Sequence, residues 1–261
     1  VDQTVCSTAT MTQLMGFVSG GATTGIWSSS GSGNFIPTST LPNAYYEFSS
    51  ADLAAGSVQL TFTSTNNSNC NAESDVMLLS FADRPFVYAG NDKVICATNQ
   101  QASFNGTITG GATSGLWTTT GTGVFYPGNT DLNPVYYLSE ADSIAGMVTI
   151  YLTSTDNGSC LPGKDTVIVS IEKVPVVSAG QDELVCLNTE AVSLSATISD
   201  VMGIQWSSSG NGTFAPNSNS LLTNYNIVTS DSTGGYVNII LSSTGNIACA
   251  PAIDTMRINF Y

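Results

Sequence analysis

Apolar and polar side chains alternate over short stretches along the whole chain. Residues 57–65 place apolar side chains at every second position, and residues 147–155 and 236–244 repeat this order. A period of two residues is typical of a strand with one buried face. Clusters of glycine, serine and asparagine, such as residues 31–34, follow these stretches and predict turns. The pattern therefore predicts many short strands and very little helix.

One unit of about 90 residues occurs three times. Cysteines and tryptophans recur in steps of 90 or 89 residues, as the sets Cys6/Cys96/Cys186, Cys70/Cys160/Cys249 and Trp27/Trp117/Trp206. Solenoid repeats are only ~20–45 residues long, so a unit of this length can close its own core. We predict three domains, at residues 1–83, 84–173 and 174–261, which are called units 1, 2 and 3 below.

The predicted joints between units are short. Residues 82–90 and 172–180 each contain one proline and no run of glycine and serine. Proline fixes its own φ and favours extended geometry in the residue before it. We therefore expect stiff connections and an extended rod. Val1 aligns with Asn91, inside a joint, as expected for a piece of a longer array.

Each unit has the pattern of about seven short strands, which is typical of two packed antiparallel sheets. The predicted fold class is all-β, a tandem array of three immunoglobulin-like antiparallel β-sandwich domains, each with one disulfide. We assign Trp27, Trp117 and Trp206 to the cores between the sheets. Residues 50–56 predict one helical turn, with Ser49 or Ser50 as its cap and Gly56 as its end.

The cysteines favour structural disulfides. The repeat selects one pairing in which each unit joins its own two cysteines, as Cys6–Cys70, Cys96–Cys160 and Cys186–Cys249. These bonds would tie the first strand of a unit to its last hairpin. Zinc is the alternative, but two cysteines per unit without any histidine make a poor ligand set. Disulfides indicate an oxidising compartment outside the cytosol.

Charge and composition exclude several function classes. The chain carries 5 lysines and arginines, 19 aspartates and glutamates and no histidine, for a net charge of −14. Histidine-based catalytic triads and histidine-ligated zinc cannot be built from it. The negative charge repels phosphate backbones and anionic lipids, so we expect no nucleic-acid partner. No apolar run approaches the ~20 residues that span a bilayer, so we expect no direct membrane insertion.

The repeated residues resemble a known family. The motif Ala-Gly-x-Asp-x-x-Val/Ile-Cys is followed by Gly-Gly-Ala-Thr-x-Gly-x-Trp, Gly-x-Gly-x-Phe-x-Pro and Ser-x-Ala-Asp-x-x-Ala-Gly-x-Val, most fully in unit 2. This series is similar to the immunoglobulin-like (PKD-like) repeats of giant Bacteroidota cell-surface adhesins, including SprB-type gliding adhesins and related type IX secretion cargo. Unit 3 departs from it at residues 200–203 and 233–235.

The resemblance also implies a modification. Asp-Ser/Thr followed by an apolar residue resembles the O-glycosylation signal of this bacterial group, and its candidate acceptors are Ser143, Thr166, Ser232 and Thr255. The strand pattern places Thr166 and Thr255 on outward positions, and the two serines are expected to be exposed in the helical turn. The alternative is that these pairs are ordinary caps and turns.

Calcium is a weak candidate ligand. Asp92 and Asp182 lie close to the joints, where tandem arrays can hold calcium. Calcium takes 6–8 oxygen ligands, and one recurring aspartate per joint is too few. The favoured interpretation is a turn aspartate that bonds its own backbone. We therefore expect no cofactor.

Exposed tyrosines could bind sugar, because one of each pair Tyr45/Tyr46 and Tyr136/Tyr137 points outward. Cross-strand packing explains them equally well. Carboxylates recur at the same positions in all units, as scaffold residues do, so we expect no enzymatic activity.

These observations together favour a structural or adhesive shaft segment of a long secreted bacterial filament. Its partners would be neighbouring repeats, surface polysaccharide or other adhesin copies, at the extracellular cell surface. The alternatives are a polysaccharide-binding module, or spacer domains of a large secreted enzyme or extracellular fibre.

Overall fold

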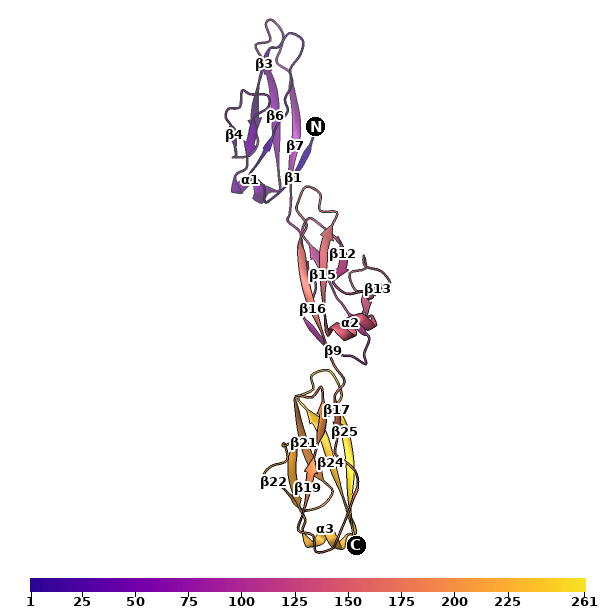
Figure 1. The fold of residues 1–261 in the computed structure, drawn as a ribbon. Coiled ribbons are helices and arrows are strands. Elements are labelled where there is room, and N and C mark those ends of the chain that lie inside the picture. Colours follow the sequence, from indigo (N-terminus) through magenta and orange to yellow (C-terminus); the bar gives the residue numbers. More distant parts are fainter.

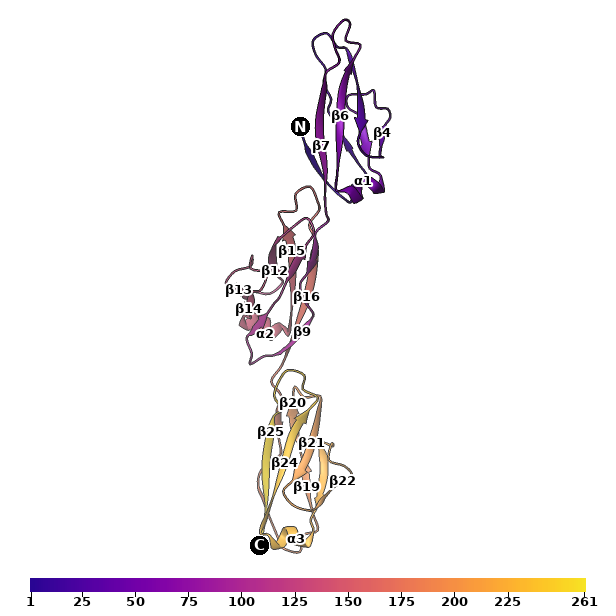
Figure 2. The ribbon, with the colours of Figure 1, turned by 180° about the vertical axis from the view of Figure 1, so that it is seen from behind.

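Strands form where the alternation predicts them and assemble into three sandwiches placed end to end (Figures 1 and 2). The computed structural model describes all 261 residues. Unit 1 contains β1 (Gln3–Cys6), β2 (Met11–Gln13), β3 (Thr24–Ser29), β4 (Asn34–Ile36), β5 (Tyr45–Glu47), α1 (Ser50–Ala55), β6 (Ser57–Thr65) and β7 (Ser74–Ala82).

Units 2 and 3 repeat this order with additional strands. Unit 2 contains β8 (Phe86–Tyr88), β9 (Lys93–Cys96), β10 (Gln101–Ser103), β11 (Thr107–Thr109), β12 (Ser114–Thr119), β13 (Val124–Tyr126), β14 (Val135–Tyr137), α2 (Glu140–Ala145), β15 (Met147–Thr155) and β16 (Lys164–Glu172). Unit 3 contains β17 (Val176–Ser178), β18 (Glu183–Val185), β19 (Ala191–Ser195), β20 (Thr197–Ser199), β21 (Gly203–Ser208), β22 (Thr213–Ala215), β23 (Leu222–Asn226), α3 (Thr229–Thr233), β24 (Tyr236–Thr244) and β25 (Ile253–Phe260).

Each unit packs a four-stranded sheet against a three-stranded one. In unit 2 the larger sheet has the order β12-β15-β16-β9 and the smaller one β10-β14-β13. Most pairs are antiparallel, but the sandwich is not purely so, because β9 runs parallel to β16 and β1 runs parallel to β7. The parallel pair carries Cys6 to a position opposite Ala82, where unit 1 ends.

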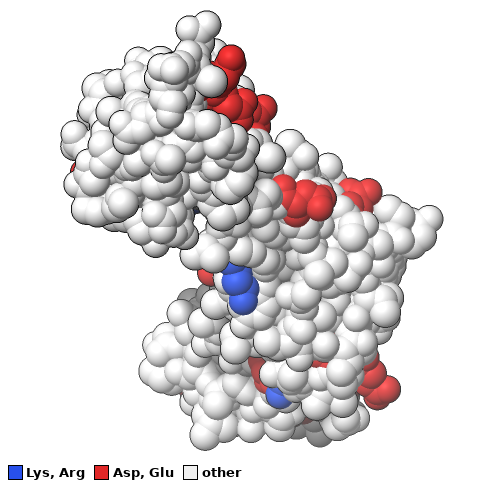
Figure 3. All heavy atoms as spheres, turned by 90° about the horizontal axis from the view of Figure 1, so that it is seen from above, with Lys and Arg blue, Asp and Glu red and all other residues white.

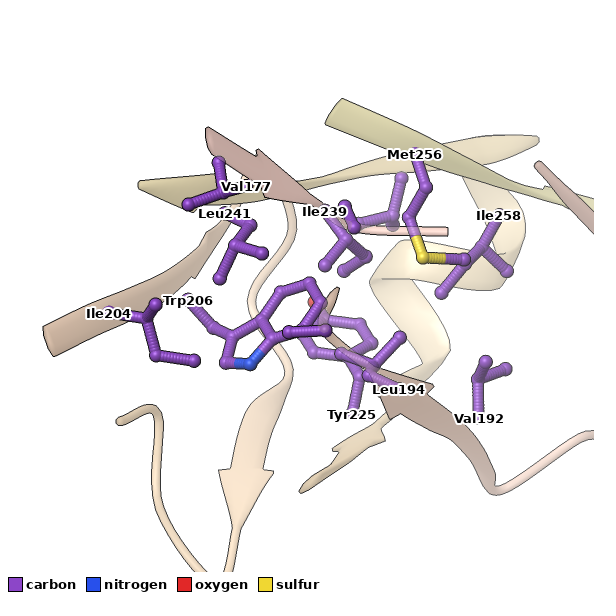
Figure 4. Close-up of a cluster of buried hydrophobic side chains, with 13 residues drawn as sticks. Val177, Val192, Leu194, Ile204, Trp206, Tyr225, Ile239, Leu241, Met256 and Ile258 are labelled. Carbon is purple, nitrogen blue, oxygen red and sulfur yellow. The ribbon is translucent and has the colours of Figure 1, made fainter. Parts of the chain in front are cut away.

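The buried side chains form three separate clusters, one from each third of the chain. Trp117 and Trp206 are fully enclosed and Trp27 is 6% exposed. Figure 4 shows the unit 3 cluster, in which Trp206 and Leu241 from the larger sheet meet Leu194 and Tyr225 from the smaller one. Each unit thus has its own core of tryptophan, tyrosine and aliphatic side chains.

A buried aspartate fastens the short helix to the sheets. In unit 2 the N-cap Ser139 and Asp142 form a capping box, and Gly146 ends α2 in the left-handed conformation. Asp142 accepts hydrogen bonds from the Tyr136 hydroxyl at 2.8 Å and from the backbone N–H of Thr122 at 2.8 Å. Asp52 and Asp231 have the same role in units 1 and 3. The expected cap at Ser49 and end at Gly56 are confirmed.

Candidate functional site at the joints

The two disulfides join neighbouring units. Cys6 of unit 1 bonds Cys160 of unit 2, and Cys96 of unit 2 bonds Cys249 of unit 3. The expected pairing within each unit, and with it one disulfide per domain, is therefore wrong. Cys70 and Cys186 form no disulfide and are exposed.

Strand direction explains the error. Cys70 precedes β7, and Cys6 lies beside Ala82 at the far end of that strand. Nine residues of strand span ~30 Å, whereas bonded cysteines have Cα atoms within ~7 Å. Across the joint, the Cα atoms of Cys6 and Cys160 are 4.8 Å apart. A repeat period fits pairing within a unit and pairing with the next unit equally well, so spacing alone could not distinguish them.

A short strand carries the chain across each joint. At the first joint, β8 pairs antiparallel with β11, and at the second, β17 pairs in the same way with β20. The backbone N–H of Ala89 donates to the Asp165 carboxylate at 2.8 Å, and that of Ala179 donates to Asp254 at 2.7 Å. The joint segment therefore belongs to the sandwich that follows it.

Close backbone contacts complete the first joint. The Cys160 sulfur lies within 3.6 Å of the carbonyl oxygens of Ala82 and Asp83. Gly110 and Gly111 lie against the backbone of Arg84 and Asp83, where an added Cβ would collide with the carbonyl oxygens. This loop of unit 2 thus packs directly on the joint backbone, at the last residue of unit 1 and the first of unit 2, with no room for a side chain between them.

The second joint adds charged contacts. The Glu172 carboxylate accepts hydrogen bonds from three successive backbone N–H groups of unit 3, at residues 247–249, over 2.7–3.1 Å. These bonds hold the pKa of Glu172 below its usual value, since they favour the ionised form. Lys173 forms an ion pair with Asp200 at 3.5 Å. No motif in the sequence indicated this role for Glu172.

Asp92 and Asp182 have partners other than those expected. Asp92 accepts a hydrogen bond from the backbone N–H of Ile168, and Asp182 accepts one from that of Arg257, both at 2.8 Å. Neither bonds its own turn; each fixes the first strand of its unit to the last one. No group of three or more acidic, cysteine or histidine side chains could hold a metal ion.

The four candidate glycosylation residues differ in access. Thr166 and Thr255 are exposed on β16 and β25. Ser143 is half-buried in α2, and its hydroxyl donates to the Ser139 carbonyl at 3.3 Å. Ser232 is only 8% exposed and bonds the Thr229 carbonyl. The expectation that both serines are exposed is therefore wrong for Ser232.

The surface offers few charged or aromatic clusters. Figure 3 shows small groups of acidic side chains scattered over a mostly uncharged surface, with few lysines and arginines between them. Tyr46, Tyr136 and Tyr225 are fully buried, whereas Tyr45 and Tyr137 are about two-fifths exposed. None of the helices has the length and apolar character required to span a membrane.

The sequence matches no known family model, and comparison with curated proteins finds no relative. Similar solved structures are tandem immunoglobulin arrays. A three-immunoglobulin-domain fragment of titin, an E-to-A mutated variant, has a TM-score of 0.51 at 13% identity and covers 91% of this chain and 87% of its own.

Two further structures have lower scores. Extracellular domains 3–5 of Drosophila OTK have a TM-score of 0.47 at 10% identity, covering 91% of this chain and 85% of that one. Immunoglobulin domains 1–4 of Sidekick-1 have a TM-score of 0.45 at 14% identity, covering 100% of this chain and 74% of that one. The strand arrangement and the likeness to titin show that this chain is an all-β tandem array of immunoglobulin-like domains.

Proposed function

We propose that the chain is a shaft segment of a long secreted filament or adhesin at the bacterial cell surface. The observation that carries the proposal is the disulfide across each joint. A joint of one peptide strand acts as a hinge, whereas a second covalent link away from that strand restricts bending and twisting. The array is thereby stiffened at the points where it would otherwise bend.

The contacts around each disulfide support the same role. β8 and β17 each pair with a strand of the unit that follows the joint. The glycines of unit 2 pack closely on the first joint, and the Glu172 hydrogen bonds link units 2 and 3 at the second. Recurring carboxylates such as Asp142 are occupied by structural hydrogen bonds. A shaft uses such contacts to hold a binding tip away from the cell, with neighbouring repeats as its main partners.

The chemistry and the resemblance support the proposed location and setting. Disulfides persist outside the cytosol, and an acidic surface keeps a crowded array soluble. The motif series supports export by type IX secretion in Bacteroidota and a role in gliding motility. Surface polysaccharide and other adhesin copies are proposed as weak partners, whose contacts multiply along the array. Thr166 and Thr255 are the proposed O-glycan acceptors.

Small-angle X-ray scattering of the full chain tests the stiff shaft. The double variant Cys6→Ser with Cys96→Ser removes both joint disulfides, and we expect a broader distribution of maximum dimensions with unchanged circular dichroism. Cys70→Ser with Cys186→Ser is the matched control, because it also removes two cysteines but neither joint disulfide. Equal scattering curves for the oxidised chain and the first variant would overturn the proposal.

A further inference from the structure

One end of unit 1 lacks a strand that units 2 and 3 both possess. β8 covers β11 in unit 2 and β17 covers β20 in unit 3, but the equivalent residues of unit 1, 17–19, have no strand partner. Met15 is 85% exposed and Phe17 is 84% exposed. Two adjoining cavities of about 390 and 380 Å³ open there, and both include Phe17, Phe62 and Asp75 in their walls.

Asp75 lacks the partner that its equivalents have. Asp165 and Asp254 are half-buried, and each accepts a hydrogen bond from the alanine N–H of the joint strand. Asp75 occupies the same position on β7 and is exposed, and its carboxylate has no hydrogen bond like those of Asp165 and Asp254. Its carboxylate is therefore placed to receive a backbone N–H from an incoming strand.

Gly21 leaves the space that such a strand requires. In unit 2 the equivalent Gly111 is pressed against the backbone of Asp83. A Cβ on Gly21 would meet only the Cys70 sulfur at 3.8 Å and a carbonyl oxygen at 3.9 Å. Nothing within unit 1 requires a glycine here, whereas a docked joint backbone would.

Cys70 lies on the rim of this groove. It occupies the position of Cys160 and Cys249, which both bond a cysteine of the preceding unit. At the other end of the chain, Cys186 occupies the position of Cys6 and Cys96, and it is also exposed. The two unbonded cysteines are therefore the two complementary halves of the joint disulfide.

We propose that this groove is a docking site for the joint strand of another repeat of the same kind. The occupant is an extended segment with the chemistry of residues 83–90: two charged residues, a run of apolar side chains and a final Ala-Gly. Cys70 then forms a disulfide with the cysteine that the incoming repeat carries at the position of Cys186. The choice of partner rests on the array role proposed above, and the groove itself is independent of it.

The covalent step is thiol–disulfide exchange with a small-molecule disulfide such as oxidised glutathione. The Cys186 thiolate attacks one glutathione sulfur, forms a mixed disulfide and releases one glutathione thiolate. The Cys70 thiolate attacks the protein sulfur of that mixed disulfide and releases the second. Two electrons pass from the cysteines to glutathione, and the two protons end on the released thiols.

Two versions of the full chain test the proposal. The acceptor carries Cys186→Ser, so that Cys70 is its unbonded cysteine. The donor carries Cys70→Ser and a copy of residues 83–90 after Tyr261. Tyr261 occupies the position of Ala82, because the Ala82 carbonyl accepts the N–H of the residue after Cys6 and the Tyr261 carbonyl accepts that of the residue after Cys186. Both are mixed in a glutathione redox buffer, and the products are mapped by mass spectrometry without reduction.

We expect a Cys70–Cys186 disulfide between donor and acceptor, with a yield about tenfold higher than for a donor without the added strand. Gly21→Val in the acceptor should abolish this gain, whereas the control Gly128→Val, also in open space, should not. The free peptide of residues 83–90 should bind the acceptor, about tenfold more weakly after Asp75→Asn.

Equal yields with and without the added strand would overturn the proposal and show that Cys70 is an ordinary exposed thiol. Insensitivity to Gly21→Val would also overturn it, because docking through this groove requires that space. The scattering test of the stiff shaft depends on the joint disulfides of Cys6 and Cys96 and not on a bond between Cys70 and Cys186, so a failure of strand docking is distinguishable from a failure of the shaft function.

Discussion

Glu172 and Cys249 contact each other across the second joint in two ways. The Glu172 carboxylate accepts the backbone N–H of Cys249 at 2.7 Å, and the Cys249 sulfur lies 3.5 Å from the Glu172 carbonyl oxygen. The residue at the position of Glu172 in the first joint is Ala82, which has no carboxylate. The two joints therefore share a disulfide but differ in their response to acid.

Glu172→Gln should remove the acid response of the second joint. The pKa of Glu172 is lower in the folded chain than in the unfolded chain. Its hydrogen bonds are therefore intact at a pH above the unfolded pKa and are lost as the pH falls through the folded pKa. Nuclear magnetic resonance should show the amide protons of Ile247, Ala248 and Cys249 titrating together below pH 4.5. In the variant these shifts should disappear.

Glu183→Gln is the matched control, because Glu183 is exposed and the three amides donate to Glu172 instead. If the three amides titrate unchanged in Glu172→Gln, another carboxylate is responsible.

Asp142→Ala should destabilise unit 2 by about 3 kcal/mol, because it leaves several buried donors without an acceptor. These are the Tyr136 hydroxyl and the backbone N–H groups of Thr122, Gly123 and Ser139. Hydrogen exchange of the unit 2 amides measures the change in unfolding free energy. Glu140→Gln, an exposed position in the same helix, should change it by less than about 0.5 kcal/mol.

The lowered pKa of Asp142 predicts that unit 2 loses stability in acid. Burial raises the pKa of its carboxyl, but the hydrogen bonds from Thr122, Ser139, Tyr136 and Gly123 outweigh burial and lower it overall. A lowered folded pKa stabilises unit 2 above the unfolded value of about 3.9, and this stabilisation is lost as the pH falls further. Asp142→Asn should make the unfolding free energy of unit 2 less dependent on pH between about pH 4 and pH 2. An unchanged pH dependence would mean that other groups cause the loss of stability.

Glycan should occur on Thr166 and Thr255 and not on Ser232. Both threonines are exposed, whereas Ser232 is buried and its hydroxyl is held by the Thr229 carbonyl. Mass spectrometry of glycopeptides from the native source measures occupancy, and Thr166→Val should remove one modified peptide while leaving that of Thr255. Modification of Ser232 at a comparable level would contradict this assignment.

Stretching the oxidised chain from its two ends should release far less length than stretching the reduced chain. The shortest covalent path runs from Val1 to Cys6, crosses to Cys160, returns to Cys96 and crosses to Cys249. It contains about 80 residue-to-residue steps in place of about 260, so the contour length should fall about threefold. Single-molecule force spectroscopy with and without reductant measures both lengths, and similar lengths would mean that the joint disulfides are not formed.

The sequence predicted the architecture because its signals are local. Alternation marked β6 and β15, the serine and glycine at the ends of α1 marked a helix, and the 90-residue step revealed the units. The parallel pairing of β1 with β7 left no comparable signal, because a three- or four-residue strand has the same pattern in either direction. The disulfide error followed from that missing direction.

The roles of Glu172 and Asp75 could not be predicted from the sequence for a related reason. A carboxylate has an ordinary appearance in sequence, and its function depends on which backbone amides the fold brings to it. Glu172 meets the amides of unit 3 through a joint that departs from the repeat, and Asp75 is informative only beside Asp165 and Asp254. The sequence shows that this aspartate recurs in each unit, but it does not show that its partner is a backbone N–H of the joint strand.

The two disulfides close rings that overlap over residues 96–160. A protease that cuts one peptide bond anywhere between Cys6 and Cys249 therefore leaves both pieces attached, because every such cut falls inside at least one ring. A joint segment, where residues such as Arg84 and Phe86 are exposed, can therefore be cut without the loss of the units beyond it. Covalent continuity of the array between Cys6 and Cys249 thus survives any single cut and fails only after a second cut or after reduction.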